Sequence, residues 1–157
     1  MIKIVIIGII VFVCGIGISL YSDSFFREQI QNVFQLTTSN GVNFIGKNFH
    51  LFNTNFYYMS FGIAFLIFSL ANSKNSLKKI IKNLIITALI FIVLAFGISA
   101  IDANLKLAQC TACDNGILKL NWNGINYGLI LGVSIVLSII PSLIFIFRNW
   151  KKLIHNN

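Results

Sequence analysis

The strongest constraint on this chain is the alternation of long apolar runs with charged gaps. Each run is 16 to 23 residues long and contains no acidic or basic residue. A hydrocarbon core of about 30 Å is crossed by about 20 helical residues, so each run can span a bilayer once interfacial residues are added. The sequence therefore predicts an all-α integral membrane protein, a four-transmembrane-helix bundle. The runs are Ile4–Tyr21, Phe56–Ala71, Leu84–Ile101 and Ile125–Phe147.

Composition supports one membrane domain over residues 1–157. Hydrophobic residues make up 57% of the chain and charged residues only 10%, which would leave large apolar patches in water if the protein were soluble. With interfacial residues included, the predicted spans are about 4–21, 52–71, 84–101 and 125–147. The connecting loops are then 22–51, 72–83 and 102–124. We find no internal repeat or low-complexity linker that would divide the chain.

The charges indicate an orientation. All four acidic residues lie in the loops 22–51 and 102–124, where four basic residues balance them. The other side carries about eight positive charges and no acid: Lys3, Lys74, Lys78, Lys79, Lys82, Arg148, Lys151 and Lys152. The positive-inside rule then places both termini and the loop 72–83 in the cytoplasm. We expect a multi-pass protein of a bacterial inner membrane.

The net charge of +8 identifies a class of partner. The basic residues lie next to the predicted spans and belong to no nucleic-acid motif, so the expected partner is anionic lipid headgroups and not nucleic acid. The headgroup contacts are assigned to the basic residues that follow the second and fourth spans. These are Lys74, Lys78, Lys79, Lys82, Arg148, Lys151 and Lys152.

The two outer loops have local patterns of their own. Between Asp23 and Leu36, apolar residues recur at helical spacing, and Arg27, Glu28 and Gln31 are expected on the opposite, polar face. This pattern predicts a short amphipathic helix on the outer membrane interface. In the second loop, short alternating segments flank residues 110–116, where Asp-Asn-Gly favours a turn, so we expect a small hairpin.

Small residues recur every four positions in the fourth span. Gly124, Gly128 and Gly132 form one row. Ser134 and Ser138 form another, about 120° away around the helix. Such rows let helix backbones approach closely in lipid. The glycine row is interpreted either as a seam for a second copy of the chain or another protein, or as a contact within the bundle.

One motif could carry chemistry, Cys110-Thr111-Ala112-Cys113, in the second outer loop. Two thiols at this spacing can form a disulfide, which persists outside the cytoplasm. The pair is interpreted as a structural staple, as a redox-active pair, or as half of a metal site. No metal is expected, because zinc needs ligands beyond two thiolates. The only other cysteine, Cys14, lies in the first span, where we expect it to be a small packing residue.

The outer cysteine pair on a four-span chain resembles, in architecture, membrane oxidoreductases that pass electrons from protein thiols to a quinone. The disulfide-forming and vitamin K epoxide reductase types belong to this class. The resemblance implies that Cys110 or Cys113 is the nucleophile and that quinone is the cofactor, with Trp122, Asn123 and Tyr127 lining its site. The chain departs from that pattern because Cys14 has no mate to form a second pair.

The absence of charge from the span centres and of a second cysteine pair favours a different class of function. Size, basicity and topology resemble the four-helix immunity proteins that protect bacteria from pore-forming colicins. This resemblance implies a non-enzymatic protein, without catalytic residues or cofactor, that binds another membrane protein within the bilayer. An accessory subunit of a larger membrane complex would have the same features. The thiol–quinone oxidoreductase is the alternative, and a carrier of small neutral or lipid-like molecules is a third class.

Overall fold

The computed structural model describes residues 2–38, 42–46, 54–73, 75–109 and 118–146. The described chain is mostly helical, and it contains four helices long and apolar enough to cross a membrane. This confirms the prediction of a helical, multi-pass membrane protein. The four candidate spans are Ile6–Thr38, Asn55–Asn72, Leu77–Ala108 and Tyr127–Ile146.

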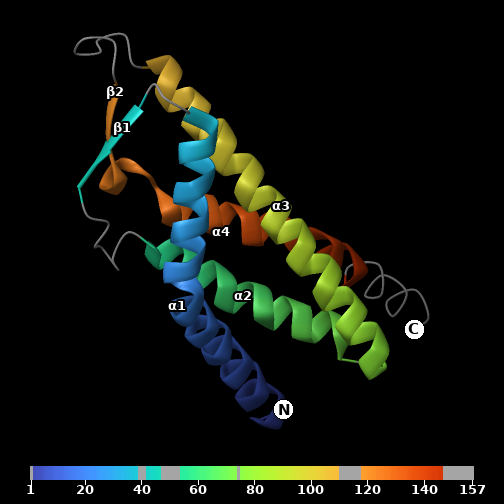
Figure 1. Cartoon of the computed structure of the whole chain (residues 1–157). Coiled ribbons are helices and arrows are strands. Elements are labelled where there is room, and N and C mark those ends of the chain that lie inside the picture. Colours follow the sequence, from blue (N-terminus) through green and yellow to red (C-terminus); the bar gives the residue numbers. More distant parts are fainter. Residues whose placement is uncertain (1, 39–41, 47–53, 74, 110–117, 147–157) are drawn as a thin grey trace.

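Two helices are much longer than a bilayer core is thick. Helix α1 (Ile2–Thr38) has 37 residues and α3 (Leu77–Gln109) has 33, corresponding to about 55 and 50 Å. Helix α2 (Asn55–Asn72) has 18 residues, about 27 Å. Figure 1 shows that α1 and α3 both extend past α2 to reach the two strands. We call this the sheet end of the molecule and the opposite one, where α2 turns into α3, the turn end.

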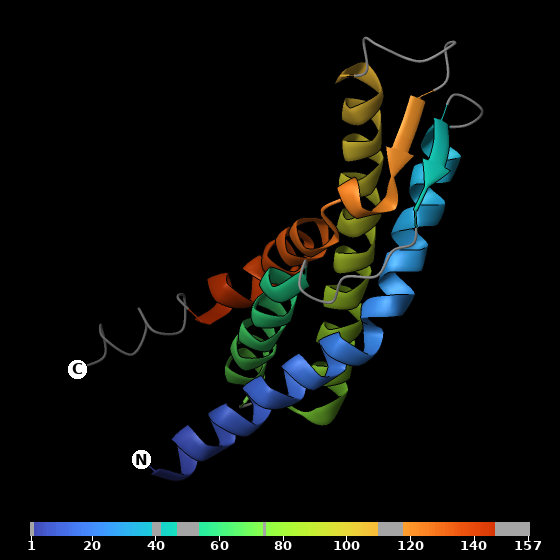
Figure 2. The same cartoon turned by 90° about the vertical axis from the view of Figure 1, so that its left-hand side faces the viewer.

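Helix α1 changes direction near its middle, as both views show (Figures 1 and 2). Its middle contains Gly15, Gly17, Ser19 and Ser22. The Ser19 hydroxyl donates to the Ile16 carbonyl oxygen at 2.7 Å, and the Ser22 hydroxyl donates to the Ile18 carbonyl oxygen at 2.9 Å. Serine bonds of this kind and glycine–serine clusters both bend helices, which accounts for the change of direction.

The helices form a ring in which each packs on two neighbours. The main contacts join α1 to α2, α2 to α4, α4 to α3, and α3 to α1. Helix α4 (Tyr127–Ser138) is interrupted at Ile139 and its helical course resumes as far as Ile146. Pro141 has no backbone N–H to donate to a carbonyl oxygen of the preceding turn, which accounts for the interruption two residues before it.

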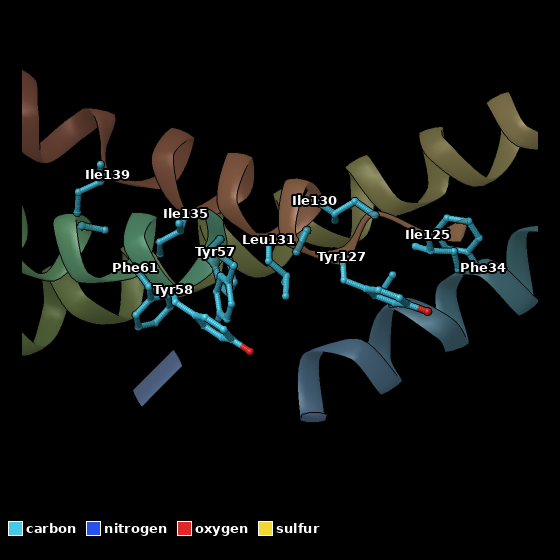
Figure 3. Packing of buried hydrophobic residues seen from close by; sticks show 14 of the residues in the cluster. Phe34, Tyr57, Tyr58, Phe61, Ile125, Tyr127, Ile130, Leu131, Ile135 and Ile139 are labelled. Carbon is cyan, nitrogen blue, oxygen red and sulfur yellow. The ribbon is translucent and has the colours of Figure 1, made fainter. Parts of the chain in front are cut away.

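The interior is built mainly by α2 and α4. In their apolar windows 44% and 39% of residues are buried, against 17% in both α1 and α3. Figure 3 shows Leu131 and Ile135 of α4 on the side of Tyr57 and Phe61 of α2. Helices α1 and α3 therefore leave most of their apolar surface open to lipid or to another protein.

The sheet joins the two loops at the sheet end. Strand β1 (Val42–Ile45) pairs in parallel with β2 (Leu118–Asn121), and the 3₁₀ turn η3 (Trp122–Gly124) follows β2. The register places Asn43 opposite Lys119 and Phe44 opposite Leu120. Figure 2 shows the pair standing beside the ends of α1 and α3.

Two local predictions for the loops are wrong in this structure. Residues 23–36 are helical, but they continue α1 without a break and do not form a separate short helix. The hairpin is absent from the described residues, because Leu105–Leu107 belongs to α3 and β2 pairs with β1 instead. Lengthening an existing helix adds a hydrogen bond for each residue without the cost of nucleating a new one. Helices α1 and α3 therefore continue into segments that were expected to be loops.

Candidate functional site

A buried ion pair lies where α2 begins. Asp23 and Arg27 of α1 are only 6% and 8% exposed, and the Arg27 Nε donates to Asp23 Oδ2 at 2.9 Å. The i, i+4 spacing on one helix brings the two side chains together. Ionisable groups buried in a membrane protein are expensive and commonly mark sites of function, which makes this pair the first candidate.

Side chains of α2 and the residue before it surround the pair. Arg27 Nη2 donates to the Thr54 hydroxyl at 3.2 Å, and Thr54 is fully buried. The hydroxyls of Tyr57 and Ser22 lie 3.1 Å apart and share a hydrogen bond. Polar contacts therefore attach the middle of α1 to the first turn of α2.

Helix α4 contributes the third side of the site. The Arg27 guanidinium carbon lies 5.3 Å from the centre of the Tyr127 ring, a cation–π contact. Gln31 Nε2 donates to the Tyr127 hydroxyl at 3.1 Å. Figure 3 shows Tyr127 reaching from α4 toward α1, with Phe34 of α1 beside Ile125. We call the set the polar cluster: Ser22, Asp23, Arg27, Gln31, Thr54, Tyr57, Tyr58 and Tyr127.

Two buried oxygens of the polar cluster have no hydrogen-bond partner among the described residues, Asp23 Oδ1 and the Tyr58 hydroxyl. The Tyr58 hydroxyl nevertheless lies near the Thr54 hydroxyl and the Asp23 carboxylate, although neither contact has the geometry of a formed hydrogen bond. A buried polar atom without a partner costs about 1 to 3 kcal/mol. The cluster thus links α1, α2 and α4. One carboxylate oxygen and one hydroxyl in it can accept an additional hydrogen-bond partner such as water.

The sequence did not lead us to this site. We expected Arg27, Glu28 and Gln31 on a polar face, but Arg27 is buried and Gln31 is half-buried against Tyr127, while Glu28 is exposed. The expected apolar face is buried at Ile30 and Phe34. One sequence feature could have indicated the buried pair: Asp23 and Arg27 have opposite charges at i, i+4 spacing immediately after an apolar run.

A second structured region lies at the sheet end, and we call it the platform: β1, β2 and η3. The Phe44 and Trp122 rings stack at 4.1 Å between centroids with an interplanar angle of 9°. Lys106 Nζ of α3 donates to the Gly124 carbonyl oxygen at 3.0 Å and ties η3 to that helix. Trp122, proposed above as a quinone neighbour, is thus engaged with β1, and Asn123 is exposed beside it.

The small residues of α4 lie inside the bundle, with one exception. Gly128, Gly132, Ser134 and Ser138 are buried within the chain, and a Cβ on Gly132 would overlap the Phe56 ring of α2. The Ser134 hydroxyl donates to the Ile130 carbonyl oxygen and the Ser138 hydroxyl to the Ile135 carbonyl oxygen. Gly124 is exposed in η3, with nothing within 4 Å of an added Cβ. The buried four leave no seam for a second protein in this arrangement.

The remaining predicted residues divide into described and undescribed ones. Lys78, Lys79 and Lys82 are exposed at the start of α3. Cys14 is exposed on α1, so the prediction that it packs inside is wrong. The other predicted cysteines and basic residues lie outside the described residues: Cys110, Cys113, Lys74, Arg148, Lys151 and Lys152.

Comparison with known protein families, curated proteins and solved structures finds no match. Among the described residues, no group of three metal-ligating side chains lies together.

Proposed function

We propose that this chain is a non-enzymatic, multi-pass inner-membrane protein that acts by binding another membrane protein. It would serve as an immunity-type protective protein or as an accessory subunit of a membrane complex. In this proposal both termini face the cytoplasm, the basic residues at the turn end contact anionic headgroups, and the platform lies on the outer side.

The observation that carries the proposal is the platform. Two loops that are separated by α2 and α3 in the sequence are joined through β1 and β2 into one folded surface. The Phe44–Trp122 stack joins β1 to η3 within that surface, and the Lys106 bond to Gly124 attaches it to α3. Preorganised surfaces bind partners without the entropic cost of ordering loops, which suits recognition.

The polar cluster supports the same function. It lies between the platform and the turn end. Its contacts through Arg27, Tyr57 and Tyr127 fix α1, α2 and α4 relative to one another. Because α1 continues from the cluster toward β1, its position sets where the platform stands. Apart from Asp23 Oδ1 and the Tyr58 hydroxyl, its polar groups are engaged with one another, which is the arrangement expected of a structural clamp.

Photocrosslinking in the native membrane tests the proposal. A photoreactive amino acid is placed at Asn43 or Lys119, two exposed residues of the platform, and at Ile9 on the lipid-facing side of α1 as the control. We expect a discrete adduct with one protein from both platform positions and none of comparable yield from Ile9. Mass spectrometry of the adduct identifies the partner and its membrane.

Absence of a discrete adduct from the platform would contradict the proposal. An adduct only with a second copy of the chain would replace it with homo-oligomerisation. Alkylation trapping of Cys110 and Cys113 in a Cys14→Ser background tests the oxidoreductase alternative in the same cells. A pair that becomes reduced when the quinone pool is reduced would favour that alternative, whereas a permanently oxidised pair agrees with a structural disulfide.

A further inference from the structure

A cavity with a mixed lining opens at the turn end, between the ends of α2 and α4 and the start of α3, and we call it the polar cavity after the side chains at its rim. Its volume is about 530 Å³. Its polar lining comes from the α2–α3 turn, the first turns of α3 and the residue after Pro141. These residues are Asn72, Asn75, Lys79, Lys82, Asn83 and Ser142. The cavity is thus large enough for a small polar group and is lined by hydrogen-bond donors.

The amides of this cavity are preorganised. Asn72 is 4% exposed, and its Oδ1 accepts hydrogen bonds from Asn75 Nδ2 at 2.9 Å and Asn83 Nδ2 at 2.7 Å. Asn72 Nδ2 donates to the Phe68 carbonyl oxygen at 2.9 Å, which fixes the amide orientation. Each amide nitrogen carries two hydrogens, so Asn75 and Asn83 each keep one for a ligand.

The charge in this cavity is uncompensated among the described residues. Lys79 and Lys82 line it, and none of the three described acids, Asp23, Glu28 and Asp102, does so. Both lysines lie in the first two turns of α3, where the positive end of the helix dipole adds to their field. The electrostatics therefore favour an anion.

An apolar cavity of about 210 Å³ adjoins the polar one. Thr87 of α3 lines both cavities. From there the apolar cavity extends into the bundle, past Ala88 and Phe91 of α3 and Phe65 of α2, and it is closed on the far side by Ile135 of α4 and Phe26 of α1. Its volume exceeds the roughly 150 Å³ of an apolar cavity that takes up benzene, so it can hold a segment of hydrocarbon. Leu84 and Ile92 on its lining are partly exposed, which leaves it open at the surface of α3.

We propose that the two cavities together bind one anionic phospholipid. Its phosphate lies among Lys79, Lys82 and the Asn75 and Asn83 amides, and one acyl chain runs past Thr87 into the apolar cavity. From Lys79 to Phe91 the helix rises about 18 Å, a length suited to a headgroup followed by a chain. This is a defined site, unlike the diffuse attraction of basic loops to a charged surface.

Native mass spectrometry of the delipidated full chain in detergent tests the site. The chain is titrated with phosphatidylglycerol, with phosphatidylcholine and with glycerol 3-phosphate, which has the anionic headgroup chemistry but no acyl chain. We expect one tightly bound phosphatidylglycerol per chain, with at least tenfold weaker binding of the other two. Equal affinity for phosphatidylcholine would overturn the anionic preference, and equal affinity for glycerol 3-phosphate would overturn the acyl-chain contact.

Two variants locate the binding. Lys79→Gln with Lys82→Gln should weaken phosphatidylglycerol binding roughly 30-fold, since each basic residue near an anionic surface contributes a factor of about five. Ala88→Phe, at an exposed lining residue, should block the apolar cavity and weaken binding of the lipid without affecting that of glycerol 3-phosphate. The control, Lys119→Gln, removes one charge at the sheet end and is compared with Lys82→Gln alone, which should weaken phosphatidylglycerol binding about fivefold. Equal loss in the control would overturn the proposal.

Discussion

At the scale of single residues, the Asp23–Arg27 pair is the most consequential feature. Removing two charges from water carries a large penalty, which close contact and additional hydrogen bonds must offset. Here Thr54 and the Tyr127 ring supply those contacts to Arg27. The pair therefore contributes a fixed geometry between three helices, and loss of either partner would leave an uncompensated buried charge.

Asp23→Asn should destabilise the protein by about 3 kcal/mol, because it leaves the Arg27 guanidinium buried without its carboxylate. Glu28→Gln makes the same chemical change at an exposed position of the same helix and should alter stability by less than about 0.5 kcal/mol. Unfolding titrations in detergent, followed by circular dichroism, measure both. Equal effects of the two substitutions would show that the buried pair has no special role.

At the scale of elements, close contact between α1 and α2 depends on two glycines. A Cβ on Gly15 would lie 3.0 Å from the Gly62 Cα and 3.0 Å from the Phe65 Cβ, so backbone of one helix packs on backbone of the other. Small residues permit such approach where lipid removes the hydrophobic incentive for association.

Gly15→Leu should destabilise the protein by about 2 kcal/mol, because the larger side chain forces α1 away from α2. Gly17→Leu is the matched control two residues along the helix, where nothing lies within 4 Å of an added Cβ. It should be neutral or slightly stabilising, because leucine has the higher helix propensity. The same unfolding titrations apply, and similar losses in both variants would argue against a close α1–α2 contact.

At the scale of the whole molecule, the four spans are predictable from sequence because each is a contiguous apolar run. The full lengths of α1 and α3 are not predictable, because charged residues such as Arg27 in α1 and Asp102 in α3 resemble loop residues although the helix continues through them. The platform depends on pairing between Val42 and Leu118, which no local pattern encodes. The polar cluster was missed for a related reason, since burial of Arg27 depends on α2 and α4.

The measurement that tests the platform most directly is disulfide formation across its strands. In a background of Cys14→Ser, Cys110→Ser and Cys113→Ser, the partners Asn43 and Lys119 are changed to cysteine and the protein is oxidised in the membrane. Neighbouring strands lie about 4.8 Å apart, within the range that a disulfide bridges.

The control changes Ile45 and Lys119 instead, two residues out of register, where the added offset of about 6.6 Å takes the pair beyond disulfide reach. We predict rapid, near-complete cross-linking of Asn43→Cys with Lys119→Cys and slow cross-linking of the control pair. Equal rates for the two pairs would contradict the parallel sheet and, with it, the surface on which the proposed recognition rests.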